Sequence, residues 1–494
     1  MSTARKILTN TVSQFVGKIA IALLGLMVVK ICTNYLSLES YGEYVLIYEY
    51  LAFFGITADL GLFTIAVREM SKDKADIPKI IGNILSLRTI MVFLSMALAS
   101  TIVFFIPRYE DTKIPVGVII ASFTTILTII NGTTTSVLQA KLKMHLASIG
   151  LIIGKIISVA FMGYIVIYGI PETSDFGFYM LIFAGTVGTL GTIFFTDHFV
   201  RKITPLVYRF DFDLWKDVLV KSLPYGIALF LNTLYFRVDS IMISFIRGQQ
   251  EVGLYGVAMK TLEQFTVLPL YFMNSVLPVL TREIEAKSER YKTIIKQSFS
   301  FLSMLSVPMV VATLVLATSA THLVADDKFV SNPEIGFFGS DAALKILIFT
   351  ILFQFLNVLF AFVLIALNKQ TKLLYINAAC VVFNVAGNAL LIPLIGFRGA
   401  AITSVLSQLF VLIFNYYFAK KELPFSLDFK VFGKVVFASL IMGGSLLVSQ
   451  KLLFPIMGYL DILPMIPIGA TVYFAVIFLT KAVDKDTLKM LKKA

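Results

Sequence analysis

The chain has 494 residues, of which 58% are apolar and 15% are charged, and its net charge is +12. A soluble globular chain carries about 25% charged residues. This composition therefore excludes a soluble enzyme, a disordered chain and a disulfide-rich secreted domain. The two cysteines and three histidines are scattered along the chain, so we expect no metal site, no disulfide framework and no cofactor.

Apolar runs, taken in chain order, predict an all-α polytopic membrane protein. A transmembrane helix needs ~20 mostly apolar residues, and helices are the only spanning form that satisfies the backbone of runs this long. About fourteen runs qualify, at residues 12–36, 41–66, 83–106, 114–137, 148–170, 178–199, 222–247, 252–280, 293–318, 341–367, 372–395, 398–418, 431–454 and 461–480. Their even number places both termini on one side of the membrane.

Basic residues predict the orientation of these spans. With the N-terminus in the cytoplasm, cytoplasmic segments hold 29 lysines and arginines and external segments hold 6. This asymmetry follows the positive-inside rule and predicts a multi-pass protein of the cytoplasmic membrane with both termini cytoplasmic. It also accounts for the net charge without a nucleic-acid partner. The first run continues from Arg5 to Leu36, which is too long for a signal peptide, so we expect a retained span.

The spans divide into two six-helix lobes and a final helix pair. Residues 1–200 form the predicted N-terminal lobe, 222–420 the C-terminal lobe, and 421–494 the last two spans with a cytoplasmic tail. Between the lobes, residues 201–221 form a cytoplasmic amphipathic linker. It contains Trp215, the single tryptophan, which suits a helix at the membrane interface.

A short internal repeat supports the two lobes. Tyr41-Gly42-Glu43-Tyr44 opens the second span, and Val252-Gly253-Leu254-Tyr255 opens the eighth. Each motif is a Gly-x-Tyr that follows one span and precedes the next. Because six spans separate the two motifs, both lobes have the same orientation, and the sequence predicts a parallel pseudo-repeat.

Three stretches resemble the polysaccharide repeat-unit flippases, the O-antigen-type exporters of the multidrug/oligosaccharidyl-lipid/polysaccharide (MATE-like) superfamily. They are Leu38-Glu39-Ser40-Tyr41-Gly42-Glu43-Tyr44, then Asp59-Leu60-Gly61-Leu62 with Arg68-Glu69, and Arg237-Val238-Asp239 with Val252-Gly253-Leu254-Tyr255. The resemblance covers the first twelve spans. It implies a two-lobed bundle that alternates access around a central cavity. It also implies a polyprenyl-diphosphate-linked oligosaccharide as substrate, handled among membrane lipids.

Charges inside the spans are the candidate functional residues. A charge at mid-bilayer costs ~2.5–3.5 kcal/mol and needs a partner, water or a route to the interface. Lys345, near a span end, can extend its side chain to the interface. The other deep cations are Lys18, Lys30, Arg88, Lys155, Arg237 and Lys260, and the carboxylates are Glu49, Asp59, Asp239 and Glu263.

Depth along the spans allows several pairings between these charges. Asp59 matches Lys18 or Arg88, Glu49 matches Lys30, and Lys260 matches Asp239 in the next span or Glu263 three residues on. About two cations remain in surplus. One interpretation is that misplaced span ends and extended side chains remove the surplus. The other is a water-filled cationic cavity that binds a diphosphate.

In that second interpretation, three cations of the first lobe and two of the second bind substrate: Lys18, Arg88, Lys155, Arg237 and Lys260. The four carboxylates are then structural, or they couple transport to H+ or Na+.

Alternative functions remain open. A lipid II flippase also needs a cationic cavity. A cation-coupled drug exporter needs cavity carboxylates, and the first span has none. A membrane glycan polymerase or ligase needs a large external loop, whereas the longest here, at residues 319–340, offers only Asp326-Asp327. The chain lacks a phosphate-binding Gly-rich loop, so we expect no ATP-driven step and no enzyme activity.

Overall fold

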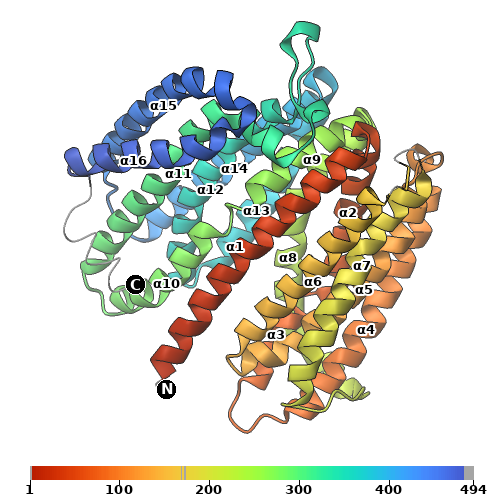
Figure 1. Ribbon diagram of the computed structural model, residues 1–494. Coiled ribbons are helices and arrows are strands. Elements are labelled where there is room, and N and C mark those ends of the chain that lie inside the picture. The colour runs from red at the N-terminus through yellow and green to blue at the C-terminus, as the bar shows by residue number, and fades with distance from the viewer. Residues whose placement is uncertain (1–2, 169, 172–173, 483–494) are drawn as a thin grey trace. The chain divides into compact units, whose positions relative to one another are not determined.

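The computed structural model describes residues 3–168, 170–171 and 174–482, with side chains from residue 17 onward except at 224, 228, 232 and 236 (Figure 1). Across this part of the chain the structure contains sixteen α-helices and five short 3-10 helices. The β structure in it is one isolated bridge between Asn332 and Phe337. The prediction of an all-α chain is confirmed.

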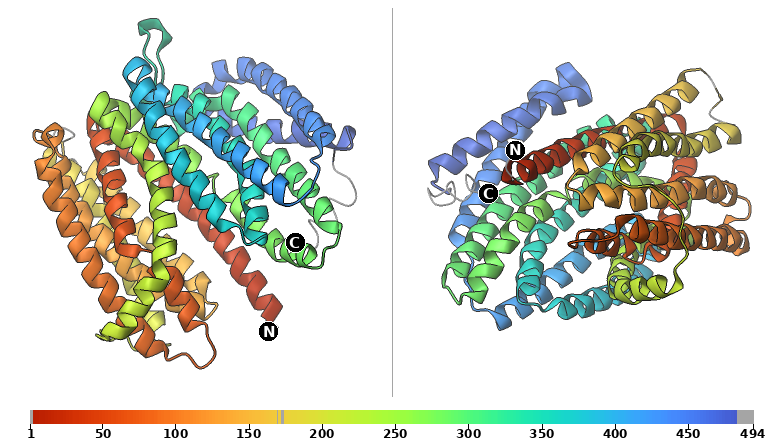
Figure 2. Two further views of the ribbon diagram at one scale, coloured as in Figure 1. Left: turned by 180° about the vertical axis from the view of Figure 1, so that it is seen from behind. Right: turned by 90° about the horizontal axis from the view of Figure 1, so that it is seen from below.

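The chain forms two compact units, residues 1–253 and 254–494. In the first unit, α2, α4, α5, α6 and α7 run side by side (Figures 1 and 2). The helices of this unit are α1 (Thr3–Tyr35), α2 (Leu38–Asp59), α3 (Leu62–Met70), α4 (Ile77–Ile102), α5 (Ile114–Ala140), α6 (Met144–Ile167), α7 (Asp175–Arg201), α8 (Phe212–Ile246) and the start of α9 (Gln249–Glu263). Two 3-10 helices, η1 (Val103–Phe105) and η2 (Pro107–Tyr109), follow α4.

The second unit contains the rest of α9 and seven further α-helices. They are α10 (Leu268–Glu285), α11 (Arg290–Val324), α12 (Ser340–Ala366), α13 (Gln370–Ile395), α14 (Phe397–Glu422), α15 (Phe429–Met457) and α16 (Ile462–Leu479). Three 3-10 helices, η3 (Asp327–Phe329), η4 (Pro333–Ile335) and η5 (Gly458–Asp461), lie in its connections. The final pair, α15 and α16, packs on α11.

Twelve stretches of the described chain are long and apolar enough to cross a membrane, or thirteen when a bent pair in α8 counts as one span. One of them, Phe429–Leu479, contains both α15 and α16 with η5 between them. Counted separately, these two helices bring the total to the predicted fourteen. The chain is a multi-pass membrane protein.

The unit boundary differs from the predicted domain division. Helix α8, placed by sequence in the second lobe, packs on α2 and α3 of the first unit. The glycines of the two repeated motifs are also in contact. A Cβ on Gly253 would lie 3.2 Å from Gly42 N, and one on Gly42 would lie 3.1 Å from Gly253 N. The division at 200 and 222 into two lobes stays a prediction.

The second predicted span, 41–66, is broken into two helices. Helix α2 ends at Asp59, and α3 begins at Leu62. Leu60 and Gly61 between them have φ angles of +42° and +76°, a left-handed conformation that ends helices and favours glycine. Asp59 Oδ1 then accepts a hydrogen bond from Phe63 N at 3.4 Å. The Asp-Leu-Gly sequence therefore ends one helix and starts the next.

Helix α8 bends where it meets this break. Its parts Phe212–Leu223 and Tyr225–Tyr235 enclose an angle of 49°, and the proline between them lacks the amide hydrogen that a continuous helix needs. A Cβ on Gly226 would lie 2.9 Å from Leu60 O, and one on Gly61 would lie 2.7 Å from Tyr225 Cβ. The break and the bend therefore contact each other through two glycines.

Small and polar residues pack α7 against α6 and α5. A Cβ on Gly154 would lie 2.5 Å from Gly188 O, and one on Gly188 would lie equally close to Gly154 O. Thr196 Oγ1 of α7 donates a hydrogen bond to Asn131 Oδ1 of α5 at 2.7 Å. In lipid, helices associate by such close packing and interhelical hydrogen bonds rather than by a hydrophobic force.

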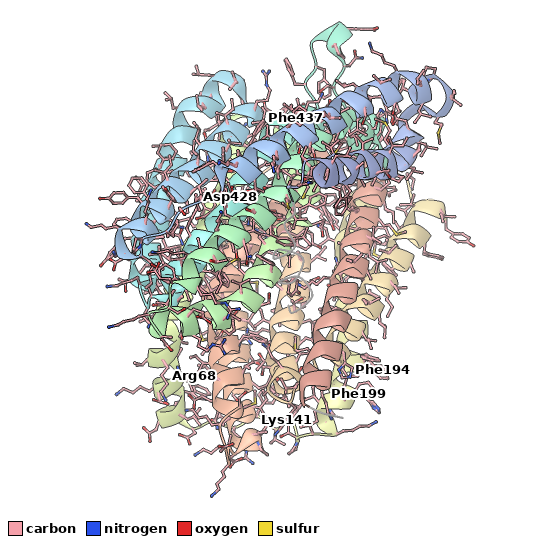
Figure 3. All side chains as sticks on the ribbon, turned by 90° about the vertical axis from the view of Figure 1, so that its left-hand side faces the viewer. Arg68, Lys141, Phe194, Phe199, Asp428 and Phe437 are labelled. Carbon is pink, nitrogen blue, oxygen red and sulfur yellow. The ribbon has the colours of Figure 1, made fainter. Side chains whose placement is uncertain are left out.

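One end of the first unit gathers the predicted cytoplasmic residues. In Figure 3, Arg68, Lys141 and Phe199 lie at the same end. They belong to α3, the turn after α5 and the last part of α7. The alternation of helix directions thus agrees with the alternation of predicted spans.

Candidate functional site

Arg88 of α4 is enclosed between α2 and α5. Its side chain is 3% exposed, and its Nη2 lies 2.6 Å from Asp59 Oδ1. Its Nη1 donates to Thr133 Oγ1 at 2.9 Å, while Nε is buried without a hydrogen-bond partner among the described residues. Of the two cations that depth matched to Asp59, the structure brings Arg88 to it.

Arg237 of α8 forms a second ion pair with α2. Its Nη1 lies 2.5 Å from Glu49 Oε2, and its side chain is 28% exposed against 7% for Glu49. Sequence depth matched Glu49 to Lys30 and did not anticipate this partner. Two residues further along α8, Asp239 is 2% exposed. The middle of α2 is therefore paired with a cation of α8 that remains partly exposed.

Lys18 and Lys155 are exposed on neighbouring helices of the first unit. Helix α1, which carries Lys18, packs on α6, which carries Lys155. A Cβ on Gly17 would lie 3.1 Å from Ser148 Cβ, which shows how closely the two helices approach. Lys155 also lies within electrostatic range of Cys32 in α1.

Lys260, the candidate in the second unit, pairs within its own helix. Its Nζ lies 3.1 Å from Glu263 Oε2, and the two side chains are 30% and 34% exposed. This is the i, i+3 partner that the sequence suggested. The five predicted cations thus comprise one buried pair, two half-buried pairs and two exposed lysines.

Sequence reasoning missed several polar residues that cross between helices. Thr133 belongs to the polar run from Asn131 to Ser136, which interrupts an otherwise apolar span and could have been noticed. In the second unit, Asn384 Nδ2 donates to Ser407 Oγ at 3.3 Å. Asn388 Nδ2 donates to Asn384 Oδ1 at 3.1 Å. Two asparagines four residues apart in an apolar helix are a comparable signal.

The carboxylates in and next to the longest predicted external segment, residues 319–340, have structural contacts. Asp326 Oδ1 accepts from Lys328 N at 3.2 Å, and Asp327 Oδ1 lies 2.6 Å from His322 Nδ1. Asp341 accepts from Ser331 N at 2.8 Å and also lies 3.6 Å from Lys345 Nζ. Within the described residues, no three His, Cys, Asp or Glu side chains could together hold a metal ion.

A bundle of helices long and apolar enough to cross a membrane defines a polytopic membrane protein. The family model described as "Polysaccharide biosynthesis protein" matches residues 7–283, more than half of the chain. The chain therefore belongs to this family. A second family model, MatE, matches residues 224–390. No curated protein sequence matches the chain.

Solved structures share the fold at low sequence identity. A lipid II flippase, MurJ in an inward closed conformation, matches with a TM-score of 0.74 and 15% identity, over 97% of this chain and 100% of that one. An inward-facing multidrug resistance MATE family transporter of the MOP superfamily matches with a TM-score of 0.65 and 13% identity, over 82% and 97%.

A MOP superfamily transporter from Pyrococcus furiosus matches with a TM-score of 0.59 and 13% identity, over 84% of this chain and 95% of that one. These likenesses are in fold. Together with the family model, they confirm the resemblance that the sequence indicated.

Proposed function

We propose that this transporter is a flippase for a polyprenyl-diphosphate-linked oligosaccharide. It moves its substrate across the cytoplasmic membrane by alternating access around a cationic central cavity, without covalent chemistry. Membership of the polysaccharide biosynthesis family supports a glycan substrate. The fold, shared with a lipid II flippase, is suited to a lipid-linked one.

The observation that carries this proposal is the position of Lys155. It lies halfway along the 24-residue α6, and its side chain is exposed. An ionisable side chain at this depth of a span marks a functional site. A water-filled passage beside α6 and α1 would give its ammonium group access to a substrate. Lys155 and Lys18 can then attract a diphosphate and donate hydrogen bonds to it.

Translocation in liposomes tests the proposal. The purified chain is reconstituted with a polyprenyl diphosphate that carries a short oligosaccharide, and a membrane-impermeant lectin reports the sugars on each side. We expect Lys155→Ala to reduce translocation about tenfold, because a charge-assisted contact to a phosphate is worth ~1.5–3 kcal/mol. Lys345→Ala is the matched control and should transport normally. Normal transport by Lys155→Ala would contradict the assigned role.

Lipid II is the second candidate substrate, because the lipid II flippase matches the whole chain in fold. The head group of lipid II is likewise a sugar joined to a polyprenyl diphosphate. The same liposomes, loaded with lipid II, separate the two candidates. Transport of lipid II at the rate of the oligosaccharide lipid would make the pyrophosphate, and not the glycan, the recognised group.

The orientation is tested in intact cells with single cysteines at positions 287 and 326. We propose that both termini, and with them Lys287, are cytoplasmic and that Asp326 is external. An impermeant maleimide should therefore label position 326 only. Coupling to H+ or Na+ through Glu49, Asp59, Asp239 or Glu263 is tested by imposing either ion gradient on the liposomes. A translocation rate that is independent of both gradients would exclude such coupling.

A further inference from the structure

The segment between α7 and α8 is extended but firmly attached to α4. Arg209 N donates to Gly82 O at 3.2 Å and to Ser86 Oγ at 3.0 Å. Asp211 N donates to Asn83 Oδ1 at 2.7 Å. A Cβ on Gly82 would lie 2.4 Å from Val207 O, so only glycine allows the segment to approach so closely. This linker is a fixed part of the first unit.

Several large apolar side chains are exposed on the predicted linker, residues 201–221, which comprises this segment and the start of α8. Val207 is 55% exposed, Phe210 61% and Phe212 73%. The rings of Phe210 and Phe212 both contact Trp215, with centroids 5.9 Å and 5.2 Å away. Trp215 itself packs on the core of the unit. Two exposed aromatic rings thus lie over a half-buried third one where α8 begins. An exposed apolar cluster of this kind marks an interaction surface.

The linker carries an excess of positive charge. Asp211 lies 2.9 Å from Lys79 Nζ, and Asp217 lies 2.5 Å from Lys221 Nζ. The hydrogen bond from Lys79, with that from the Leu214 amide, lowers the pKa of Asp211, so this pair stays ionised. Among the remaining linker charges, four cations and one carboxylate are exposed: Arg201, Lys202, Arg209, Lys216 and Asp213.

We infer that Phe210, Phe212 and Trp215, with Arg209 and Lys216, form a docking surface for anionic phospholipid head groups. The rings enter the boundary between head groups and acyl chains, and the two cations bind the lipid phosphates. Aromatic residues and lysine or arginine are the types that anchor a segment at this depth. Phe210 precedes α8, and Phe212 and Trp215 lie in its first turn, so the rings lie at the end of a membrane-crossing helix, beside the bilayer surface. The anionic leaflet assigned here is the cytoplasmic one, which rests on the proposed orientation.

The chemistry favours lipid over a protein partner. A protein interface buries its aromatic residues in a patch depleted of charge, whereas the linker has three rings and more exposed cations than exposed carboxylates. A negatively charged membrane surface attracts nearby lysine and arginine. Because the linker is already fixed by α4, docking requires no ordering of the backbone, which lowers its entropic cost.

Tryptophan fluorescence tests this inference, because the sequence contains only one tryptophan. The variant Phe212→Trp with Trp215→Phe moves the probe to the most exposed ring. The full chain is reconstituted into vesicles that contain phosphatidylglycerol and phosphatidylcholine, with bromine on the acyl chains of one or the other. We expect brominated phosphatidylglycerol to quench the probe about twofold more than brominated phosphatidylcholine at equal mole fraction.

Two further variants sharpen the test. Adding Arg209→Gln and Lys216→Gln should equalise quenching by the two lipids. The control Phe194→Trp with Trp215→Phe places the probe on α7, at a position 86% exposed within a span (Figure 3). It should be quenched equally by both lipids. Equal quenching at position 212 in the otherwise unchanged linker, or no quenching there, would overturn the inference. Transport is not measured, so failure of the proposed function would leave this result intact.

Discussion

Two ion pairs share helix α2 but leave their cations in very different surroundings. Arg88, paired with Asp59, is 3% exposed and also donates to Thr133. Arg237, paired with Glu49, is 28% exposed. In sequence both look alike, as a cation in one span and a carboxylate in another. The difference indicates that Arg88 stabilises the first unit, whereas Arg237 keeps a face that a ligand can reach.

The break in α2 explains part of this difference. Asp59 is the last residue of α2, and Leu60 and Gly61 turn the chain before α3 begins. Asp59 Oδ1 therefore serves both the start of α3 and the Arg88 guanidinium. Removing Arg88 affects a helix junction, while removing Arg237 affects a pair on a continuous part of α2.

The largest effect on stability is expected for Arg88→Ala. It leaves Asp59 and Thr133 without their buried partner, and breaking a buried pair costs ~3–5 kcal/mol. The melting temperature of the purified protein in detergent should fall strongly. Arg88→Lys should recover only part of the loss, because arginine reaches Thr133 and Asp59 with two separate nitrogens, whereas lysine has its three donors on one nitrogen. An unchanged melting temperature together with lost transport would contradict the stabilising role of Arg88.

A smaller effect is expected for Gly61→Ala. The φ angle of +76° and the 2.7 Å approach to Tyr225 Cβ oppose any side chain at this position. Strain of this kind costs ~1–3 kcal/mol. The melting temperature should fall, and Gly25→Ala is the control, because no atom lies within 4 Å of a Cβ placed there. Equal melting temperatures for the two variants would show that the contact between the break and the bend is not rigid.

Arg237→Ala is expected to change transport more than stability. Partly exposed pairs contribute ~0–1 kcal/mol, so the melting temperature should move little while translocation falls about tenfold, as for loss of a charge-assisted contact. The exchange Arg237→Glu with Glu49→Arg separates the two roles. Restored transport in the exchanged protein would assign Arg237 a purely structural function, because the pair would be intact with its charges reversed.

Lys260→Ala should cost still less stability. Its partner Glu263 lies three residues away on the same helix, and such pairs contribute ~0.2–0.5 kcal/mol. If Lys260 belongs to the cationic site, translocation in liposomes falls at an unchanged melting temperature. Lys260→Arg should keep partial activity, since it retains the charge. Full activity of Lys260→Ala would remove the second unit's predicted cation from the site.

The smallest effect is expected for Lys345→Ala. The side chain is 42% exposed and 3.6 Å from Asp341, which keeps its hydrogen bonds from Ser331 and Thr318. Melting temperature and transport should both stay within error of the unchanged protein. A clear loss of transport would show that this lysine, near the start of α12, takes part in substrate movement.

Individual residues show where prediction from sequence succeeded and where it stopped. The i, i+3 pair of Lys260 and Glu263 was one of two alternatives, and it could be named because residues three apart on a helix are neighbours. The pairing of Arg88 with Asp59 was one of two alternatives, since depth along a span does not say which helices are neighbours. The Arg237 pair with Glu49 was not anticipated for the same reason, as it joins residues 188 positions apart.

The sequence by itself determined the membrane class, the all-α fold, the approximate number of spans and their charge asymmetry. These properties are local, because each helix satisfies its own backbone in lipid and each loop carries its own charges. Only the tertiary structure decided the break at Leu60–Gly61, the attachment of the linker to α4 and the partner of each buried cation. These depend on which helix faces lie together, and that is set by small residues and interhelical hydrogen bonds far apart in the chain.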